Sequence, residues 1–443
     1  MAEAKHRVVI IGGGFGGLYA AQRLGNAPNV QVTLIDRRNF HLFQPLLYQV
    51  ATGGLSPANI AAPLRSVLKR QRNTQVLMGE VVDIDLANRK VKLRDQAEVP
   101  YDYLIVAAGA SHAYFGHPEW EKLAPGLKTI EDATEIRARV LSAFERAERT
   151  DDVQERQRLL TFVIVGGGPT GVELAGAVSE LAHHTLRKDF RNIDPTTARV
   201  LLIEGQSRVL STYHEKLSAK AKRSLEEMGV EVWLNTTVTA IEPYGVTIQR
   251  EGKQEVIPTA TVLWGAGVQA SPLAKLLAQA CGAETDRAGR IMVQEDLTLP
   301  GYPEVYVIGD MVHLKMPDGK LVPGVAPAAM QMGSYAATDI LDKIAGRLRR
   351  GPFRYWDKGS MATIGRASAV MEAGPIRLSG LIAWLAWLFV HILFLIRFEN
   401  RILVMWQWFV NYVTRGRSAR LITGEHPEVA VLQAATKPSG FQA

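Results

Sequence analysis

Two parts of the chain alternate short β-branched runs with stretches of helical periodicity. In the first part, Val8–Ile11 and Val30–Ile35 are typical of buried parallel strands and flank a helix-like stretch that begins at Phe15. In the second part, Phe162–Val165 and Val200–Ile203 flank a long helical stretch in the same way. Each part is a strand–helix–strand unit, so the pattern predicts an α/β protein with two Rossmann-like domains.

Three further apolar runs indicate that the second domain is inserted into the first. Tyr103–Ala107 and Val305–Ile308 are predicted as late strands of the first domain, and Thr261–Leu263 as the last strand of the second. The simplest topology returns the chain to the first domain near residue 270. The predicted domains are residues 1–120 with 270–345, and residues 121–269.

The C-terminal part of the chain follows a different pattern. Residues 351–375 alternate loosely and predict a small β segment, whereas Leu381–Ile396 and Ile402–Val413 are nearly all apolar. The first of these apolar segments is shorter than the ~20 residues that span a bilayer. We therefore expect residues 346–425 to form a β segment and two membrane-associating helices, followed by a tail at residues 426–443.

The second C-terminal helix is predicted to be amphipathic. Trp406, Phe409 and Val413 lie away from a polar stripe, as in helices that lie in a membrane interface. The stripe consists of Asn400, Gln407, Asn411 and Thr414. Tryptophans and arginines suited to an anionic membrane surface surround both segments, namely Trp384, Trp387, Trp406, Trp408, Arg397, Arg401, Arg415, Arg417 and Arg420. A buried helical hairpin, a homodimer interface and a true span are the alternatives.

A glycine loop follows the first strand. Gly12, Gly14 and Gly17 have the G-x-G-x-x-G spacing, in which the glycines allow a tight turn, the approach of a pyrophosphate and helix–strand packing, respectively. The phosphates would lie at a helix N-terminus, where free amides and the helix dipole favour an anion. Asp36 at the end of the next strand is placed to accept a hydrogen bond from a ribose hydroxyl, and we expect the adjacent Arg37 to contact the same cofactor.

A second glycine loop repeats this spacing at Gly166, Gly168 and Gly171. Glu204, at the end of the following strand, occupies the position of the acidic partner. A carboxylate there suits the ribose of NADH and repels the 2′-phosphate of NADPH. Arg208 lies close by in the sequence and leaves NADPH as the alternative.

Two dinucleotide sites in one chain indicate that one cofactor reduces the other. Nicotinamide donates a hydride and flavin accepts it, so we expect FAD in the first domain and NADH in the second. Asp310 ends a late strand of the first domain and is placed for the ribityl hydroxyls of the flavin. Glycines at the ends of neighbouring strands complete the expected cofactor contacts, namely Gly109, Gly267 and Gly309.

Composition narrows the choice of electron acceptor. Cys281 is the only cysteine, which excludes a disulfide pair beside the flavin and a thiolate metal site, and we expect no bound metal. The net charge of +7 is compatible with nucleic acid, a membrane or an acidic ligand, and the arginines near the C-terminal segments favour the membrane over nucleic acid. A strand begins within a few residues of Met1, so we expect the cytoplasmic face of the cell membrane. The remaining acceptors are a small molecule, oxygen or a lipid-soluble quinone.

With these residues in place, the chain resembles the type II NADH dehydrogenase family, which are single-subunit NADH:quinone oxidoreductases with FAD and no proton pumping. The resemblance covers about residues 7–424. It is carried by four segments taken together, namely Asp36 to Gly53, Gly166 to Glu173 (GGGPTGVE), Val305 to Asp310 (VYVIGD), and residues 383–401 (AWLAWLFVHILFLIRFENR).

The resemblance assigns roles to residues near the flavin. It implies that Thr52 and Gly53 lie against FAD and that Glu173 faces the nicotinamide–flavin region. By position alone, Glu173 would lie in the first turn of a helix, where an acid is often only a favourable dipole partner. Lys358 matches a family lysine near the flavin, with a plain surface lysine as the alternative.

The resemblance also implies a quinone-side helix. The run from Pro323 to Gln331, which includes Ala326, resembles a family segment that commonly carries two glutamines. Gln331 is retained, but Pro327 replaces the other glutamine. This departure bears on the type of quinone and the geometry of its binding, and it does not change the expected flavin chemistry.

The expected reaction has two halves. NADH gives a hydride to FAD, and a membrane quinone then takes two electrons and two protons. One alternative is an NAD(P)H-dependent reductase of a specialised naphthoquinone or other small acceptor. Another is a flavin-bearing redox sensor whose turnover is incidental.

Overall fold

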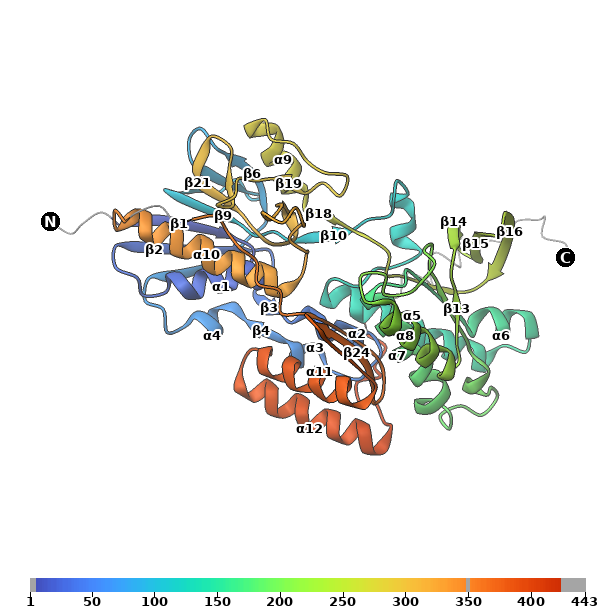
Figure 1. Ribbon diagram of the computed structural model, residues 1–443. Helices are drawn as coiled ribbons and strands as arrows, with labels where there is room; N and C mark the ends of the chain where they lie inside the picture. The colour runs from blue at the N-terminus through green and yellow to red at the C-terminus, as the bar shows by residue number, and fades with distance from the viewer. Residues whose placement is uncertain (1–4, 348–350, 424–443) are drawn as a thin grey trace. The chain divides into compact units, whose positions relative to one another are not determined.

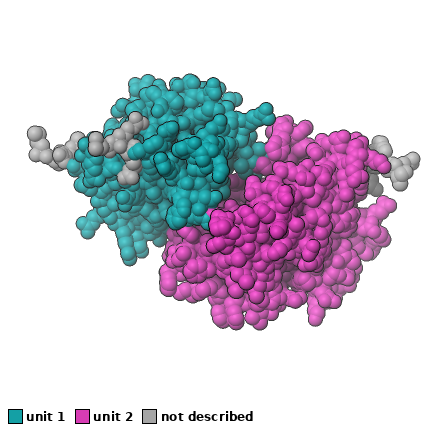
Figure 2. Space-filling model, in the orientation of Figure 1, with its two compact units in different colours: residues 1–42, 61–113, 268–358 teal, residues 43–60, 114–267, 359–443 magenta. Residues whose placement is uncertain are grey.

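The computed structural model of the chain describes residues 5–347 and 351–423. These residues form two compact units, coloured separately in Figure 2. Unit 1 consists of the described residues up to 42 with residues 61–113 and 268–358, and unit 2 of residues 43–60 and 114–267 with those from 359 onward. The tail predicted at residues 426–443 lies outside the described residues.

Unit 1 is built on a six-stranded sheet with the order β20-β21-β9-β1-β2-β5. Its strands are Thr298–Leu299, Tyr302–Val307, Tyr103–Val106, His6–Ile11, Val30–Asp36 and Thr74–Met78, and all neighbouring pairs are parallel except β20 with β21. The inner strands are buried on both faces, which explains why their sequences are continuous apolar runs instead of alternating ones. Their existence and position confirm the strands predicted for the first domain.

Two helices of unit 1 pack closely together. These are α1 (Phe15–Leu24) and α10 (Ala326–Ile344), drawn in blue and orange in Figure 1. A Cβ at Gly333 would lie 2.1 Å from the carbonyl oxygen of Gly16, so only glycine permits this approach. α10 is thereby held against the helix that follows the first glycine loop.

Unit 2 contains a four-stranded parallel sheet with the order β13-β12-β11-β17. Its strands are Val230–Trp233, Arg199–Ile203, Thr161–Val165 and Thr261–Trp264. All of them lie in sequence between β9 and β21, which are neighbours in the sheet of unit 1. This topology confirms the predicted α/β class and the insertion of the second dinucleotide-binding domain into the first.

Unit 2 also includes two segments that lie outside its central stretch of sequence. Residues 43–60 form short helices, η1 (Gln44–Leu46), α2 (Leu47–Ala51) and α3 (Pro57–Ile60). Residues from 359 onward form an antiparallel sheet of β23 (Ser360–Gly365), β24 (Ser368–Ala373) and β25 (Ile376–Ser379). The compact units thus join residues 43–60 and the C-terminal segment to the second domain, whereas the predicted boundaries kept them apart.

Close backbone contact joins the C-terminal sheet to α7 (Pro169–Glu180), the helix after the second glycine loop. A Cβ at Gly176 would lie 1.7 Å from the carbonyl oxygen of Ile364 in β23. A side chain at position 176 would therefore push β23 away from α7. The sequence analysis did not single out Gly176, because its role depends on a strand that lies almost 190 residues further along the chain.

The two predicted C-terminal helices are confirmed as α11 (Leu381–Phe394) and α12 (Phe398–Thr414). Two residues of the polar stripe of α12 face the segment of residues 43–60, where Asn400 Nδ2 and Asn411 Nδ2 donate to the carbonyl oxygens of Ala58 and Gly54, whereas Thr414 is exposed. Apolar residues face outward instead, and Phe389 and Phe409 are 70% and 59% exposed. This arrangement is the reverse of an ordinary surface helix and excludes a hairpin buried within the described chain.

The aromatic and basic residues near these helices divide into two groups. Trp406 is exposed, but Trp387 is buried, and Trp384 and Trp408 are half-buried and line a pocket. Only one of these four tryptophans, Trp406, is therefore exposed as an interfacial position would require. Likewise, Arg417 and Arg420 are ion-paired with Glu180 and Asp189, so they are not free for lipid headgroups as expected. Among the described residues, no helix is both long and apolar enough to cross a bilayer.

Candidate functional site

The first glycine loop has a distinct constraint at each of its three glycines. Gly12 has a φ of +99°, and a Cβ there would lie 2.3 Å from the carbonyl oxygen of Ala107. A Cβ at Gly17 would lie 1.8 Å from the carbonyl oxygen of Gly12. At Gly14, by contrast, a Cβ would meet no described atom within 4 Å. Contacts within the fold therefore require glycine at positions 12 and 17. At Gly14 the backbone instead borders an open space, here called a cradle, that a side chain would fill.

The second glycine loop repeats this geometry in unit 2. Gly166 has a φ of +102°, a Cβ at Gly171 would lie 1.8 Å from the carbonyl oxygen of Gly166, and a Cβ at Gly168 would meet no described atom within 4 Å. α1 and α7 begin directly after Gly14 and Gly168, so both cradles adjoin a helix N-terminus. Both sites therefore fit a dinucleotide pyrophosphate.

The acid at each strand end braces its own loop. Asp36 Oδ2 accepts a hydrogen bond from the Gly13 amide at 2.6 Å, and Glu204 Oε2 accepts one from the Gly167 amide at 2.5 Å. Burial raises the pKa of Asp36, and the hydrogen bonds from the backbone of Gly13 and Arg38 oppose this rise. Each carboxylate has further lone pairs, so bracing the loop is compatible with the predicted contact to a ribose.

The basic residues near these acids have different surroundings. Arg37 is exposed and lies close enough to lower the pKa of the Asp36 carboxyl slightly. Arg208 donates to the carbonyl oxygen of Ser211 at 2.7 Å and pairs with Glu215 at 3.8 Å. Arg208, the residue that made NADPH the alternative nucleotide, is therefore already bonded to groups of the chain itself.

His41 is a loop-supporting residue that the sequence analysis left unassigned. Its Nδ1 lies 2.9 Å from the carbonyl oxygen of Gly13, and its ring stands edge-on to Phe15. Burial lowers the pKa of His41 to about 4, so the ring is neutral at pH 7. A carbonyl oxygen only accepts, so Nδ1 carries the proton and donates it to the loop. The pairing of β3 (Phe40–Leu42) with β4 (Ala61–Pro63), which only the fold reveals, holds the ring there.

The other predicted cofactor residues of unit 1 meet at one edge of its sheet. Gly109 and Gly309 have φ values of +69° and +75° and follow the neighbouring parallel strands β9 and β21, beside the loop after β1. Asp310 is in the 3-10 turn Gly309–Met311, and Ala326 is the first residue of α10. In unit 2, Gly267 has a φ of +78° and follows β17, next to β11 and its glycine loop. These are the carboxyl ends of the strands, where α/β sheets bind ligands.

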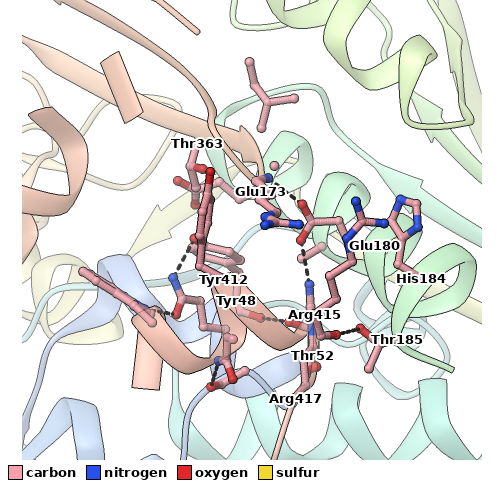
Figure 3. Close-up of a pocket in the computed structure, with 18 of the residues that line it drawn as sticks. Tyr48, Thr52, Glu173, Glu180, His184, Thr185, Thr363, Tyr412, Arg415 and Arg417 are labelled. Atoms are coloured by element: carbon pink, nitrogen blue, oxygen red, sulfur yellow. Dashed lines mark hydrogen bonds and ion pairs between the residues drawn. The ribbon is translucent and has the colours of Figure 1, made fainter. Parts of the chain in front are cut away.

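Unit 2 contains a pocket of about 350 Å³ between α2, α7, β23 and the C-terminal helices (Figure 3). Its wall combines indole rings with several polar and charged side chains. The lining includes Tyr48, Gln49, Thr52, Glu173, Glu180, His184, Trp384, Trp387, Trp408, Tyr412, Arg415 and Arg417. A mainly apolar cavity with a few polar groups is typical of a site for a small organic molecule.

Glu173 is the most strongly perturbed acid of this pocket. Burial raises the pKa of Glu173 to about 8, and a hydrogen bond from the Thr363 backbone only partly offsets this effect. Glu173 is the fifth residue of α7 and lies beyond its first turn, which contains no acidic residue. The sequence-based position in the first turn was therefore wrong, and the dipole explanation is weakened because that effect fades within one turn.

Thr52 and Gly53 are held in unit 2 by the segment that follows α12. Arg417 Nη1 donates to the carbonyl oxygen of Thr52 at 3.1 Å, and the Ala419 amide donates to that of Gly53 at 3.1 Å. Arg417 Nη2 donates to Glu180 Oε2 at 2.9 Å. The pocket wall is therefore closed by an ion pair between α7 and the end of the described chain, a contact that no local sequence signal predicts.

Gln331 and Lys358, which the resemblance assigns to the quinone side and to the surroundings of the flavin, lie in unit 1. Gln331 Nε2 donates to the carbonyl oxygen of Trp356, and Gln331 Oε1 accepts from the Trp356 amide, each at 2.9 Å. The Lys358 ammonium lies 5.5 Å from the centre of the Trp356 ring. Gln331 thus forms two hydrogen bonds with the backbone of Trp356, two residues before Lys358, a structural role that the sequence did not indicate.

Comparison with known proteins supports the interpretation of these loops. A family model described as pyridine nucleotide-disulphide oxidoreductase matches residues 6–333, and one described as the NDH2 C-terminal domain matches residues 357–418. The structure of NDH2 from Plasmodium falciparum in complex with NADH has a TM-score of 0.85 at 21% identity, covering 95% of this chain and 100% of that chain. These matches define the class, a two-dinucleotide α/β oxidoreductase with an additional C-terminal domain.

Curated relatives identify the family within this class. The type II NADH:quinone oxidoreductases Ndh and NdhA of Mycobacterium tuberculosis are 48% and 49% identical to this chain, with 95% of the chain and 91% and 90% of the relatives covered. Demethylphylloquinone reductase NdbB of Synechocystis is 31% identical over 92% of the chain. The chain belongs to the type II NADH:quinone oxidoreductase family, as its sequence motifs predicted.

The different surroundings of the three loop glycines generate a test of cofactor binding. Gly14→Val places its side chain in the open cradle, so we expect a folded protein that carries little FAD. Gly17→Ala is the matched comparison, and we expect it to lower the melting temperature because its Cβ would collide with Gly12. Flavin released on denaturation and thermal unfolding are measured for both variants. A Gly14→Val protein with the full flavin content of its parent would contradict the assignment of this loop.

The position of Glu204 generates a test of nucleotide preference. Two unit charges about 5 Å apart repel by roughly 1–3 kcal/mol near a protein surface. Glu204→Gln removes this repulsion toward a 2′-phosphate and keeps an acceptor for the Gly167 amide. We expect the ratio of kcat/KM for NADH to that for NADPH to fall about tenfold, as 1.4 kcal/mol corresponds to a factor of ten. Glu227→Gln, an exposed change at the end of α8 (Glu215–Glu227), is the control, and an unaltered ratio in Glu204→Gln would refute the assignment.

Proposed function

We propose that this chain is a single-subunit NADH:quinone oxidoreductase that holds FAD and does not pump protons. The observation that carries this proposal is the repeated loop, in which the second glycine of each copy faces an open cradle. Two such cradles in one chain suit one donor nucleotide and one resident flavin. FAD, when bound, supplies the chemistry, since it accepts a hydride from NADH and passes two electrons to a quinone.

The two cradles have separate roles in this proposal. Gly12, Gly14 and Gly17 hold the pyrophosphate of FAD, Asp36 bonds its ribose, and Asp310 bonds its ribityl chain. Gly166, Gly168, Gly171 and Glu204 hold NADH in the same manner. Residues 1–120 with 270–345 then serve as the FAD domain, residues 121–269 as the NADH domain, and residues 346–425 as the membrane-associating part.

The pocket of unit 2 is the proposed site of the quinone head group. Its indole and tyrosine rings supply flat apolar surfaces, and its volume of about 350 Å³ lies within the usual range for small-molecule sites. Glu173 lines this pocket and is neutral at pH 7 because its pKa is raised to about 8. A neutral carboxylic acid can donate a proton to a quinone oxygen as the electrons arrive, which makes Glu173 the proposed catalytic acid.

The remaining predicted residues have supporting roles in this proposal. Thr52 lines the quinone pocket, and the segment around Arg417 holds both Thr52 and Gly53 through their carbonyl oxygens. Gln331 fixes the backbone at Trp356 and thereby places Lys358, whose cationic side chain favours an electron-rich partner. We propose that turnover depends most on Glu173, Gln331 and Lys358.

The raised pKa of Glu173 generates the test of this function. Only the protonated acid donates, so we expect the ratio of NADH:menadione to NADH:ferricyanide activity to fall as the pH rises through about 8. Glu173→Gln should lower this ratio roughly 100-fold at pH 7, as for other general acids, and make it insensitive to pH. Glu145→Gln on an exposed face of α5 (Ile130–Arg149) is the control. A parent protein that reduces ferricyanide but no quinone would overturn the proposed function.

We propose that α11 and α12 lie on the cytoplasmic face of the cell membrane. Their outward faces carry exposed apolar side chains that include Leu381, Ile382, Leu385, Phe389, Leu393, Phe398, Ile402, Leu403, Met405, Trp406, Phe409 and Val413. A surface with this many exposed apolar side chains is unusual on a protein that contacts only water. On a bilayer, it places the pocket close to a substrate that is dissolved in the lipid. Because Arg417 and Arg420 are paired within the chain, apolar insertion contributes more to binding than attraction to anionic headgroups.

Charged substitutions on this face test the membrane proposal. We expect Phe389→Glu with Phe409→Glu to lower partitioning into phosphatidylcholine–phosphatidylglycerol vesicles by at least tenfold, since burying one such side chain contributes about 1.5–3 kcal/mol. High salt should release the parent protein only partly, because screening weakens charge attraction alone. Met78→Glu, an equally exposed apolar position in unit 1, is the control. If the double variant instead turns a stable dimer into a monomer and leaves vesicle binding unchanged, the face is a homodimer interface.

A further inference from the structure

Three side chains on the wall of the quinone pocket form a continuous chain of hydrogen bonds. Trp408 Nε1 donates to Gln49 Oε1 at 2.6 Å, and Gln49 Nε2 donates to the Tyr48 hydroxyl at 2.9 Å. Figure 3 labels Tyr48 among the residues that line this pocket. Trp408 belongs to α12, whereas Gln49 and Tyr48 belong to α2. The chain of bonds therefore exists only when α12 is packed against α2.

The chemistry of these groups fixes the direction of every bond. An indole N–H can only donate, so the amide atom that faces Trp408 must be the oxygen of Gln49. The amide nitrogen therefore faces Tyr48, and since it can only donate, the Tyr48 oxygen must accept. The single hydroxyl hydrogen of Tyr48 is left for another acceptor, and the structure shows none for it among the described residues.

The surroundings of Tyr48 keep this hydrogen in place and add a second donor. Burial and the nearby Glu173 raise the pKa of the Tyr48 hydroxyl, so it stays protonated at any physiological pH. The ring of Trp387 stands at 61° to that of Tyr48, with the ring centres 6.5 Å apart. The indole N–H of Trp387 is buried and has no partner in the described part of the chain. The Tyr48 hydroxyl is therefore a donor without an acceptor in this part of the pocket wall, which suits a ligand whose polar atoms accept.

We propose that Tyr48 donates its hydroxyl hydrogen to a carbonyl oxygen of the quinone, and that Trp408 sets this direction through Gln49. The inference rests on the proposed function, because it assigns a contact within the same quinone site. Tyr48 is then a substrate-binding residue, and Gln49 and Trp408 are positioning residues. The helix that meets the membrane would thus also prepare the pocket for an acceptor ligand.

An isosteric change at position 49 reverses the direction of the bond. Gln49→Glu places a carboxylate that only accepts, so it takes the hydrogens of both Trp408 and Tyr48 and turns the hydroxyl hydrogen away from the pocket. We expect the KM for menadione to rise roughly tenfold, the loss expected for one unmade hydrogen bond to a buried polar group, with a smaller change in kcat. Tyr48→Phe should give a similar rise. The Kd for menadione, measured by quenching of tryptophan fluorescence without NADH, should rise in parallel.

The pH dependence separates bond direction from a loss of packing. Once the carboxyl introduced by Gln49→Glu is protonated, it carries a hydrogen and can donate to Tyr48 as the glutamine does. The KM of Gln49→Glu should therefore return toward the parent value as the pH is lowered, whereas that of Tyr48→Phe should stay high. Gln44→Glu makes the same chemical change at an exposed position nearby and should leave both the menadione and the ferricyanide rates at the parent values.

A double variant decides whether Gln49 acts through Tyr48. In Tyr48→Phe with Gln49→Glu, the KM for menadione should equal that of Tyr48→Phe alone, since no hydroxyl remains to redirect. Equal and additive effects of the two changes would overturn the inference, as would a parent-like KM and Kd in Tyr48→Phe. If the parent protein reduces ferricyanide and no quinone, the proposed function itself fails, and these two failures are distinguished by the parent measurement.

Discussion

The close approach of β23 to α7 is the contact on which the rest of unit 2 depends. A side chain at Gly176 would collide with the Ile364 carbonyl, so the two backbones meet only because this residue is glycine. Their contact places the Thr363 backbone beside Glu173, and it lets the Arg366 amide bond Glu180 Oε1 at 2.5 Å. The nucleotide domain and the C-terminal domain thereby share one pocket wall, and the resulting desolvation keeps the Glu173 carboxyl neutral at pH 7.

α12 connects this pocket to the surface of the molecule through its two opposite faces. Asn400, Asn411 and Trp408 form hydrogen bonds with residues 43–60, whereas Phe409 and Val413 on the same helix remain exposed. The polar face is needed because the carbonyl and amide groups it meets would otherwise be buried without partners. In the proposed function, the apolar face contacts lipid, so one helix both completes the proposed quinone pocket and brings it to the membrane.

The dinucleotide loops could be predicted from sequence almost completely because their geometry is local. The turn, the helix start and the acidic strand end all lie within about forty residues in each copy, and spacing alone fixed their order. The strands and the two C-terminal helices were predictable for the same reason. The sequence misplaced Glu173 by less than one helical turn, and three of the four C-terminal tryptophans proved to be half-buried or buried residues of the pocket wall.

By itself, then, the sequence determined the fold class, the insertion of one domain into the other, both glycine loops with their acids, and the family. Only the tertiary structure decided the joining of residues 43–60 to the C-terminal segment, the neutral state of Glu173, the support of Gly13 by His41 and the chain from Trp408 to Tyr48. The physical reason is range. Periodicity and spacing indicate which side chains share one face of an element. Desolvation and hydrogen-bond direction instead depend on partners in other elements, from 28 residues away for His41 and Gly13 to 359 for Trp408 and Gln49, which meet only when the chain has folded.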